Sequence, residues 1–203
     1  MVKTRFFQSV AIALLLLYLG VAFAAWFQLE NLFPYADYVF EAVFGGVVLV
    51  LYPKWDWKKG PLTFGASVGF FFALAAGFAI YEGSGLLGYG MPFALKDPET
   101  VLILLLVGPV VEEWVFRGAL WKLFEEITGS VWPAFLFTSV IFSYAHYHVI
   151  STVDPQFASF VRYQAIYTLG LGLFCGGMRL QLGWRAGLLT HVSFNFGFWL
   201  ASL

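Results

Sequence analysis

The chain has 203 residues, of which 61% are hydrophobic and 11% are charged, whereas about 25% of the residues in an average soluble domain are charged. A water-soluble globule of this length cannot bury so much apolar surface, which excludes soluble enzymes. The net charge of −1 gives no basic surface for DNA or RNA, so we expect no nucleic-acid partner. What remains is an integral, multi-pass membrane protein.

A helix needs about 20 apolar residues to cross the hydrocarbon core of a bilayer. By that measure the sequence predicts seven spans, at residues 6–27, 35–52, 61–81, 100–124, 131–149, 160–180 and 184–203. The apolar stretches are continuous rather than alternating, which excludes the strands of a membrane barrel. We therefore predict an all-α fold, a polytopic transmembrane helix bundle of about seven spans that forms a single domain over residues 1–203.

Basic residues predict the orientation of this bundle, because cytoplasmic loops are enriched in Lys and Arg. With the N-terminus in the cytoplasm, the predicted outer side receives only Lys96 and Arg162. The predicted cytoplasmic ends receive Lys3, Arg5, Lys54, Lys58, Lys59, Lys122, Arg179 and Arg185. We expect the C-terminus on the outer side.

The first span has a second interpretation. Lys3 and Arg5, the apolar run and the small residues of Ala22-Phe23-Ala24 also fit a signal peptide with its cleavage site. The run is longer than the apolar region of most signal peptides, which favours a retained helix.

Three predicted spans carry polar clusters at positions where lipid is expected. An ionised side chain at the centre of a bilayer costs about 2.5–3.5 kcal/mol, so three unpaired charges in one span would cost roughly 7–10 kcal/mol. These groups must therefore face the interior of the bundle and meet partners there. The clusters are Glu112, Glu113 and Arg117 in the fourth span, His146 and His148 in the fifth, and His191 and Asn195 in the seventh.

The spacing of the fourth-span cluster predicts its chemistry. Glu113 and Arg117 are four residues apart on one helical face, which is suitable for an ion pair. Adjacent carboxylates in a low-dielectric site cannot both ionise cheaply, and Arg117 can hold one of them as a carboxylate. The other is then suited to act as a general base near neutral pH.

His148 lies two residues beyond His146 and points away from it on a helix, so we expect it at the interface.

The order of these motifs resembles a known family. Glu112-Glu113-x-x-x-Arg117 is followed by Phe142-x-x-x-His146 and then by His191-x-x-x-Asn195. This ordered set is similar to that of the CPBP intramembrane proteases, also called the ABI or type II CAAX prenyl endopeptidase family. The likeness lies within residues 101–203, and residues 1–99 are expected to form three family-variable helices.

The resemblance implies an intramembrane endopeptidase of glutamic type that cuts near the C-terminus of a membrane-associated or lipid-anchored protein or peptide. It implies that Glu112 and His146 activate the attacking water, and that Glu113 and Arg117 form a supporting pair. His191 and Asn195 would donate hydrogen bonds to the oxyanion. The expected partners are membrane lipid and a substrate with a membrane-embedded or lipidated C-terminal region, and no cofactor is expected.

Three other interpretations fit parts of this pattern. Glu112, His146 and His191 could instead hold zinc, although the HExxH string common in zinc proteases is absent. A non-catalytic membrane scaffold could keep the same bundle, although it would have no need of all four of Glu112, His146, His191 and Asn195. A transporter could use buried charges as a proton relay, but the two halves lack matching broken helices.

Overall fold

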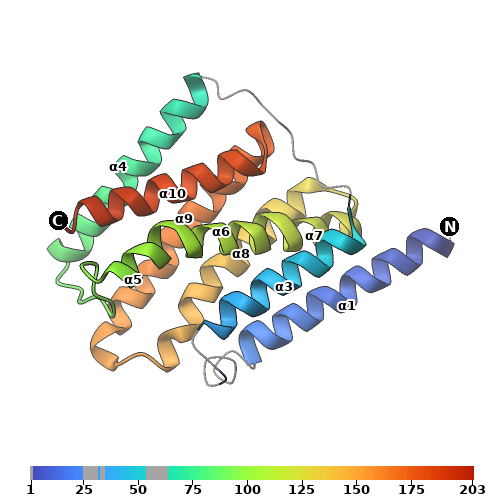
Figure 1. The fold of residues 1–203 in the computed structure, drawn as a ribbon, viewed down its shortest axis with the longest axis horizontal. Coiled ribbons are helices and arrows are strands. Elements are labelled where there is room, and N and C mark those ends of the chain that lie inside the picture. The colour runs from blue at the N-terminus through green and yellow to red at the C-terminus, as the bar shows by residue number, and fades with distance from the viewer. Residues whose placement is uncertain (1, 25–31, 33–34, 54–63) are drawn as a thin grey trace. The chain divides into compact units, whose positions relative to one another are not determined.

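The computed structural model describes residues 2–24, 32, 35–53 and 64–203, and every regular element within these ranges is helical (Figure 1). The prediction of an all-α fold is confirmed. The predicted span ends at Phe27 and Pro61 lie outside the described residues, as do Lys54, Lys58 and Lys59. The longer elements are α1 (Val2–Ala24), α3 (Ala36–Leu51), α4 (Phe64–Leu86), α8 (Val131–Tyr147), α9 (Ala158–Leu182) and α10 (Trp184–Leu200).

The fourth predicted span is a run of helical segments that continues without a break from Pro98 to Thr128. The segments are α5 (Pro98–Leu102), η1 (Ile103–Val107), α6 (Gly108–Glu112), η2 (Glu113–Leu120) and α7 (Trp121–Thr128). Both η1 and η2 are π-helical, a widened geometry that often occurs at functional sites. In η1 the Gly108 N–H bonds to the carbonyl of Ile103, just before Pro109, which has no N–H to donate.

The helix ends follow local sequence rules. Asp97 caps α5, with its carboxylate accepting from the Thr100 backbone N–H, and Pro98 occupies the first turn. Gly129 and Gly183 end α7 and α9 with positive φ angles of 70° and 94°, which glycine adopts without steric cost. The connection after α8 contains the short 3₁₀ helices η3 (His148–Ser151) and η4 (Pro155–Phe157).

The described residues group into two compact units, which we describe separately. The first unit takes its residues from 1–55 and 111–138 and the second from 56–110 and 139–203. The prediction of a single domain is not tested by this grouping and stays a prediction.

In the first unit α1 and α3 run side by side and antiparallel (Figure 1). The Tyr52 hydroxyl donates to the carbonyl of Phe7 at 2.7 Å, and the Tyr18 hydroxyl donates to Glu41 at 2.9 Å. The α3 helix also packs against η2, where a Cβ atom at Gly45 would overlap the Trp114 indole. The missing side chain at Gly45 thus lets the two helices approach closely.

In the second unit α4 and α10 pack along each other (Figure 1). A Cβ atom at Gly77 would overlap the backbone carbonyl of Phe194, and one at Gly197 would overlap that of Leu74. The two backbones are therefore in contact, as is usual for helices that associate through small residues in membranes. The Tyr163 hydroxyl of α9 donates to the carbonyl of Ile80 in α4 at 3.1 Å, which joins a third helix to this pair.

Two helices in the described part of the chain have the length and hydropathy of a membrane span. They are Arg5–Phe23 within α1 and Ala66–Leu86 within α4. By contrast α3 has 16 residues and α8 and α10 have 17 each, below the roughly 20 that a perpendicular crossing needs. The prediction of seven spans is thus not confirmed and stays a prediction.

Candidate active site

The first unit contains a buried ion pair between Glu113 and Arg117. Arg117 Nη1 lies 3.2 Å from Glu113 Oε1, and both side chains have no exposed surface. The i,i+4 spacing that predicted this pair is present, although the backbone between the two residues is π-helical rather than α-helical. Removing either partner of such a buried ion pair strongly destabilises the folded protein, because the remaining charge is left uncompensated in the interior.

Glu112 differs from its neighbour in exposure. It is the last residue of α6 and is half-buried, whereas Glu113 is fully buried. One carboxylate is therefore enclosed with its cation, and the adjacent one keeps access to the surface of its unit. Glu112 is therefore the more accessible of the two carboxylates.

Another buried carboxyl group, which the sequence motifs did not mark, lies in the same unit. Glu41 on α3 is 5% exposed and accepts a hydrogen bond from Tyr18, itself 1% exposed. Glu41 stands in an apolar stretch with only Asp37 nearby, so no motif marks it. A lone acidic residue inside a predicted span was nevertheless a signal that could have found it.

In the second unit one aromatic ring contacts two of the predicted site residues. The ring of Phe142, which is completely buried, lies edge-on to His146 with ring centres 4.7 Å apart. It also lies edge-on to His191 with ring centres 5.6 Å apart. The structure thus brings α8 and α10 together through Phe142, and His191 is 3% exposed at this contact.

The hydrogen bond of His146 determines which of its nitrogens can accept a proton. His146 Nδ1 lies 2.9 Å from the carbonyl oxygen of Phe142, one helical turn earlier. Since a carbonyl oxygen can only accept, Nδ1 carries the proton in this bond, and Nε2 of the neutral ring has a lone pair. A half-buried imidazole in this form can accept a hydrogen bond from water.

Asn195 forms a bond between two helices of the second unit. Its Nδ2 donates to the carbonyl oxygen of Leu104 in η1 at 2.8 Å. The amide nitrogen has two N–H groups, and this bond uses one of them. The bond holds the amide in a fixed orientation, which suits both an interhelical role and a role as a donor to substrate.

His148 occupies η3, just beyond the end of α8. Its Nδ1 lies 2.7 Å from the carbonyl oxygen of Ala145, and its side chain is half-buried. The fifth predicted span extended to residue 149, whereas α8 ends at Tyr147, so His148 belongs to the connection. Its expected position at an interface is not tested by this placement and stays a prediction.

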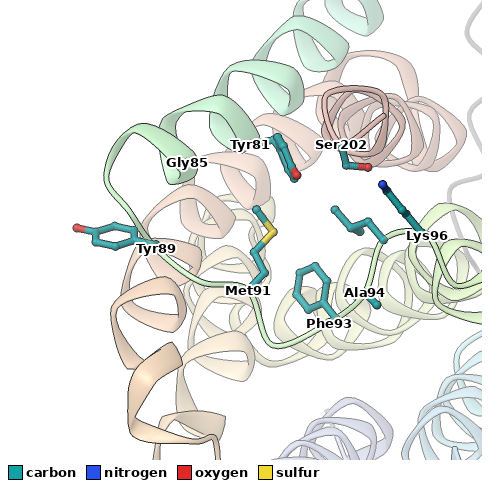
Figure 2. Close-up of a pocket in the computed structure, with 9 residues that line it drawn as sticks. Tyr81, Gly85, Tyr89, Met91, Phe93, Ala94, Lys96 and Ser202 are labelled. Carbon is teal, nitrogen blue, oxygen red and sulfur yellow. The ribbon is translucent and has the colours of Figure 1, made fainter.

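The second unit also has a pocket of about 470 Å³, which Figure 2 shows at the end of α4. None of the predicted site residues lines it. Its lining residues are Tyr81, Gly85, Tyr89, Met91, Phe93, Ala94, Leu95, Lys96 and Ser202.

A metal site was an alternative interpretation of Glu112, His146 and His191. Among the residues that the structure describes, no group of three His, Cys, Asp or Glu side chains is arranged to hold a metal ion. Zinc therefore stays an untested alternative. Cys175, the one cysteine of the chain, is buried in α9.

Comparison with known families gives one result. Residues 96–197, half of the chain, match the family described as type II CAAX prenyl endopeptidase Rce1-like. The matched range contains all the predicted site residues and does not contain Glu41. No curated protein and no solved structure matches the chain.

Proposed function

The chain belongs to the Rce1-like family of type II CAAX prenyl endopeptidases, and from this premise we propose that it is an intramembrane endopeptidase. Its substrates are membrane-associated or lipid-anchored proteins or peptides, which it cuts near their C-terminus. The observation that carries the proposal is that residues 96–197 match a protease family and contain the three ordered motifs in full.

In the proposed reaction Glu112 and His146 act on the same water molecule. Glu112 takes a proton as the water oxygen attacks the carbonyl carbon of the peptide, and the C–N bond then breaks as that proton passes to the leaving amine. The products are a carboxylic acid and an amine, and proton transfer from the acid then leaves a carboxylate and an ammonium group. The half-buried state of Glu112 and the Nε2 lone pair of His146 support these roles.

Three of the remaining residues support the reaction from fixed positions. Arg117 neutralises Glu113 within the interior, so that a single adjacent carboxylate is available as the base. Asn195, held by Leu104, would donate its other N–H to the oxyanion. His191 would donate alongside it, oriented by its contact with Phe142.

The proposed location is the membrane, with the N-terminus in the cytoplasm and the C-terminus outside. Two apolar helices support it, as do the large apolar side chains on the surface of the second unit, such as Phe71 at 73% and Ile166 at 73% exposed. Monomeric soluble proteins rarely expose contiguous apolar patches larger than a few hundred Å².

The proposal is tested by comparing membrane-protein C-termini from cells that carry wild type, Glu112→Gln or His146→Ala. We expect new C-termini only with wild type, since loss of a general base lowers the rate by about 10²–10⁴-fold. Glu126→Gln is the matched control, because Glu126 pairs with Lys122 at the surface of α7 and lies outside the motifs.

Three outcomes would overturn this assignment or its mechanism. Full cleavage by Glu112→Gln or His146→Ala would disprove the proposed mechanism. Identical C-termini in cells with and without the wild-type protein would favour a non-catalytic membrane scaffold. Loss of activity on chelation with recovery on addition of zinc would instead favour the metalloprotease, for which Glu112, His146 and His191 are the candidate ligands.

A further inference from the structure

The carbonyl group of Leu104 in η1 cannot be paired in the way that is usual within a helix. In a π-turn each carbonyl accepts from the N–H five residues later, as that of Ile103 does from Gly108. The next bond of this kind would join Leu104 to residue 109, but Pro109 has no N–H. An α-turn would instead use the Gly108 N–H, which is already directed at Ile103. Within this described segment, neither usual donor therefore serves the Leu104 carbonyl.

Asn195 supplies the missing donor from another helix. The α10 helix, which carries Asn195, packs against η1, and Asn195 Nδ2 donates to the Leu104 carbonyl oxygen at 2.8 Å. Pro109 itself is buried, and a backbone carbonyl left unpaired away from water costs free energy. In membrane proteins a neighbouring helix commonly replaces the bond that a proline removes. The Asn195–Leu104 bond is therefore the replacement for the bond that Pro109 cannot make.

The Leu104 carbonyl also determines the orientation of the Asn195 amide. A carbonyl oxygen only accepts hydrogen bonds, so the nitrogen of the amide must face Leu104. A rotated amide would place its own oxygen against the Leu104 oxygen, and two acceptors repel each other. In the observed orientation the second N–H of Nδ2 can donate to a further acceptor, which is the role that the proposed function gives it at the oxyanion.

We propose that Pro109 is a positioning residue for Asn195, because its missing N–H reserves the Leu104 carbonyl for the Asn195 amide and so fixes that amide as a donor. This inference rests on the proposed function, in which Asn195 stabilises the oxyanion. A carbonyl of a regular helix points along the helix axis toward the N–H of the next turn. A carbonyl without that helical donor can serve a partner on a neighbouring helix.

The first test observes the Asn195 amide directly and needs no substrate. The chain contains two asparagines, Asn31 and Asn195. Nuclear magnetic resonance of the full-length protein, labelled with nitrogen-15 in its asparagine side chains, should therefore give two amide signals, and Asn195→Ala identifies one of them. We expect a hydrogen-bonded proton of Asn195 to resonate downfield of its position in an unfolded peptide. A wild-type signal at the unfolded-peptide position would overturn the proposal without any proline variant.

Pro109→Ala supplies an N–H and lets the segment form a regular helix, in which the Leu104 carbonyl is bonded along the axis. The Asn195 signal should then move toward its unfolded-peptide position. Pro98→Ala is the matched control, because Pro98 lies in the first turn of α5, where N–H groups have no helical acceptor. This variant should leave the Asn195 signal in place. An identical Asn195 signal in Pro109→Ala and in wild type would overturn the proposal.

The second test uses the kinetics of a cleaved substrate. Asn195→Ala should lower kcat by about 10²–10³-fold with little change in KM, which is the usual effect of losing one oxyanion donor. Pro109→Ala should lower kcat by a smaller factor. The double variant should be no slower than Asn195→Ala, because the amide that Pro109 positions is already absent. A purely structural role would lower kcat by the same factor with and without Asn195, and this result would overturn the proposal.

The failure of this inference can be told apart from the failure of the proposed function. If Glu112→Gln still cleaves the substrate, the proposed function is wrong. If Glu112→Gln is inactive while Pro109→Ala keeps the kcat and the Asn195 signal of wild type, only the role of Pro109 is wrong.

Discussion

Glu112 and Glu113 are adjacent in sequence but differ in their surroundings. Glu113 is fully buried against Arg117, and Glu112 is half-buried at the end of α6. The residue type therefore does not decide which glutamate can react, because exposure and the nearest charge do. The same argument applies to the imidazoles, since the Nδ1 bond of His146 to a carbonyl determines that its Nε2 can accept.

At the residue scale we predict a pH-dependent contribution from Asp97, the exposed cap of α5. The Thr100 backbone N–H and hydroxyl both donate to its carboxylate at 2.8 Å and lower the pKa of Asp97 from its ordinary value of 3.8. A lowered pKa means that the stabilisation is present above pH 3.8 and is lost as the pH falls through the pKa of the folded state.

Asp97→Ala should therefore lower the thermal unfolding midpoint at neutral pH and have little effect in strong acid. Asp97→Asn is the control, because asparagine caps a helix comparably and does not titrate. The measurement is unfolding in detergent as a function of pH. A midpoint difference between wild type and Asp97→Ala that persists in strong acid would contradict the prediction.

At the scale of elements, the α4–α10 contact depends on two glycines. A Cβ atom at Gly77 or at Gly197 would meet a backbone carbonyl of the other helix, which cannot turn away as a side chain can. Close approach of backbones is the main source of attraction between helices in lipid, where the hydrophobic effect does not act.

We therefore predict that Gly77→Ala and Gly197→Ala each destabilise the protein by about 1–3 kcal/mol through overpacking. Gly170→Ala in α9 is the matched control, since nothing lies within 4 Å of a Cβ atom there. Alanine at that position should be neutral or stabilising by up to about 1 kcal/mol. Denaturation in detergent gives the free energies, and a Gly77→Ala variant as stable as Gly170→Ala would disprove the close crossing.

At the scale of the whole molecule, the distribution of basic residues predicts the orientation in the membrane. Ser130, between α7 and α8, should lie in the cytoplasm, and Ser151, after α8, should lie outside. Ser151 is exposed and Ser130 is half-buried. The native Cys175 is buried, so labelling of the single variants Ser130→Cys and Ser151→Cys can be measured against a low background.

An impermeant thiol reagent applied to intact cells should label Ser151→Cys and leave Ser130→Cys unlabelled until the cells are permeabilised. The opposite pattern would reverse the predicted orientation. Equal labelling of both positions in intact cells would contradict a membrane crossing by α8.

The helices and the order of the motifs were predictable from sequence alone. Apolar runs and helix-end residues act through their neighbours in the chain, so their effect needs no tertiary information. The helix-end residues are Asp97-Pro98 at the start of α5 and the glycines at 129 and 183. The Glu113–Arg117 pair was predictable for the same reason, because its partners lie one helical turn apart.

Only the tertiary structure decided which helix faces which. The Tyr18–Glu41 bond joins residues 23 positions apart, and the Asn195–Leu104 bond joins residues 91 positions apart. The backbone contact at Gly77 likewise involves two separate helices. A sequence pattern records local preference, whereas these contacts depend on how whole helices pack, and packing brings together residues that no short motif connects.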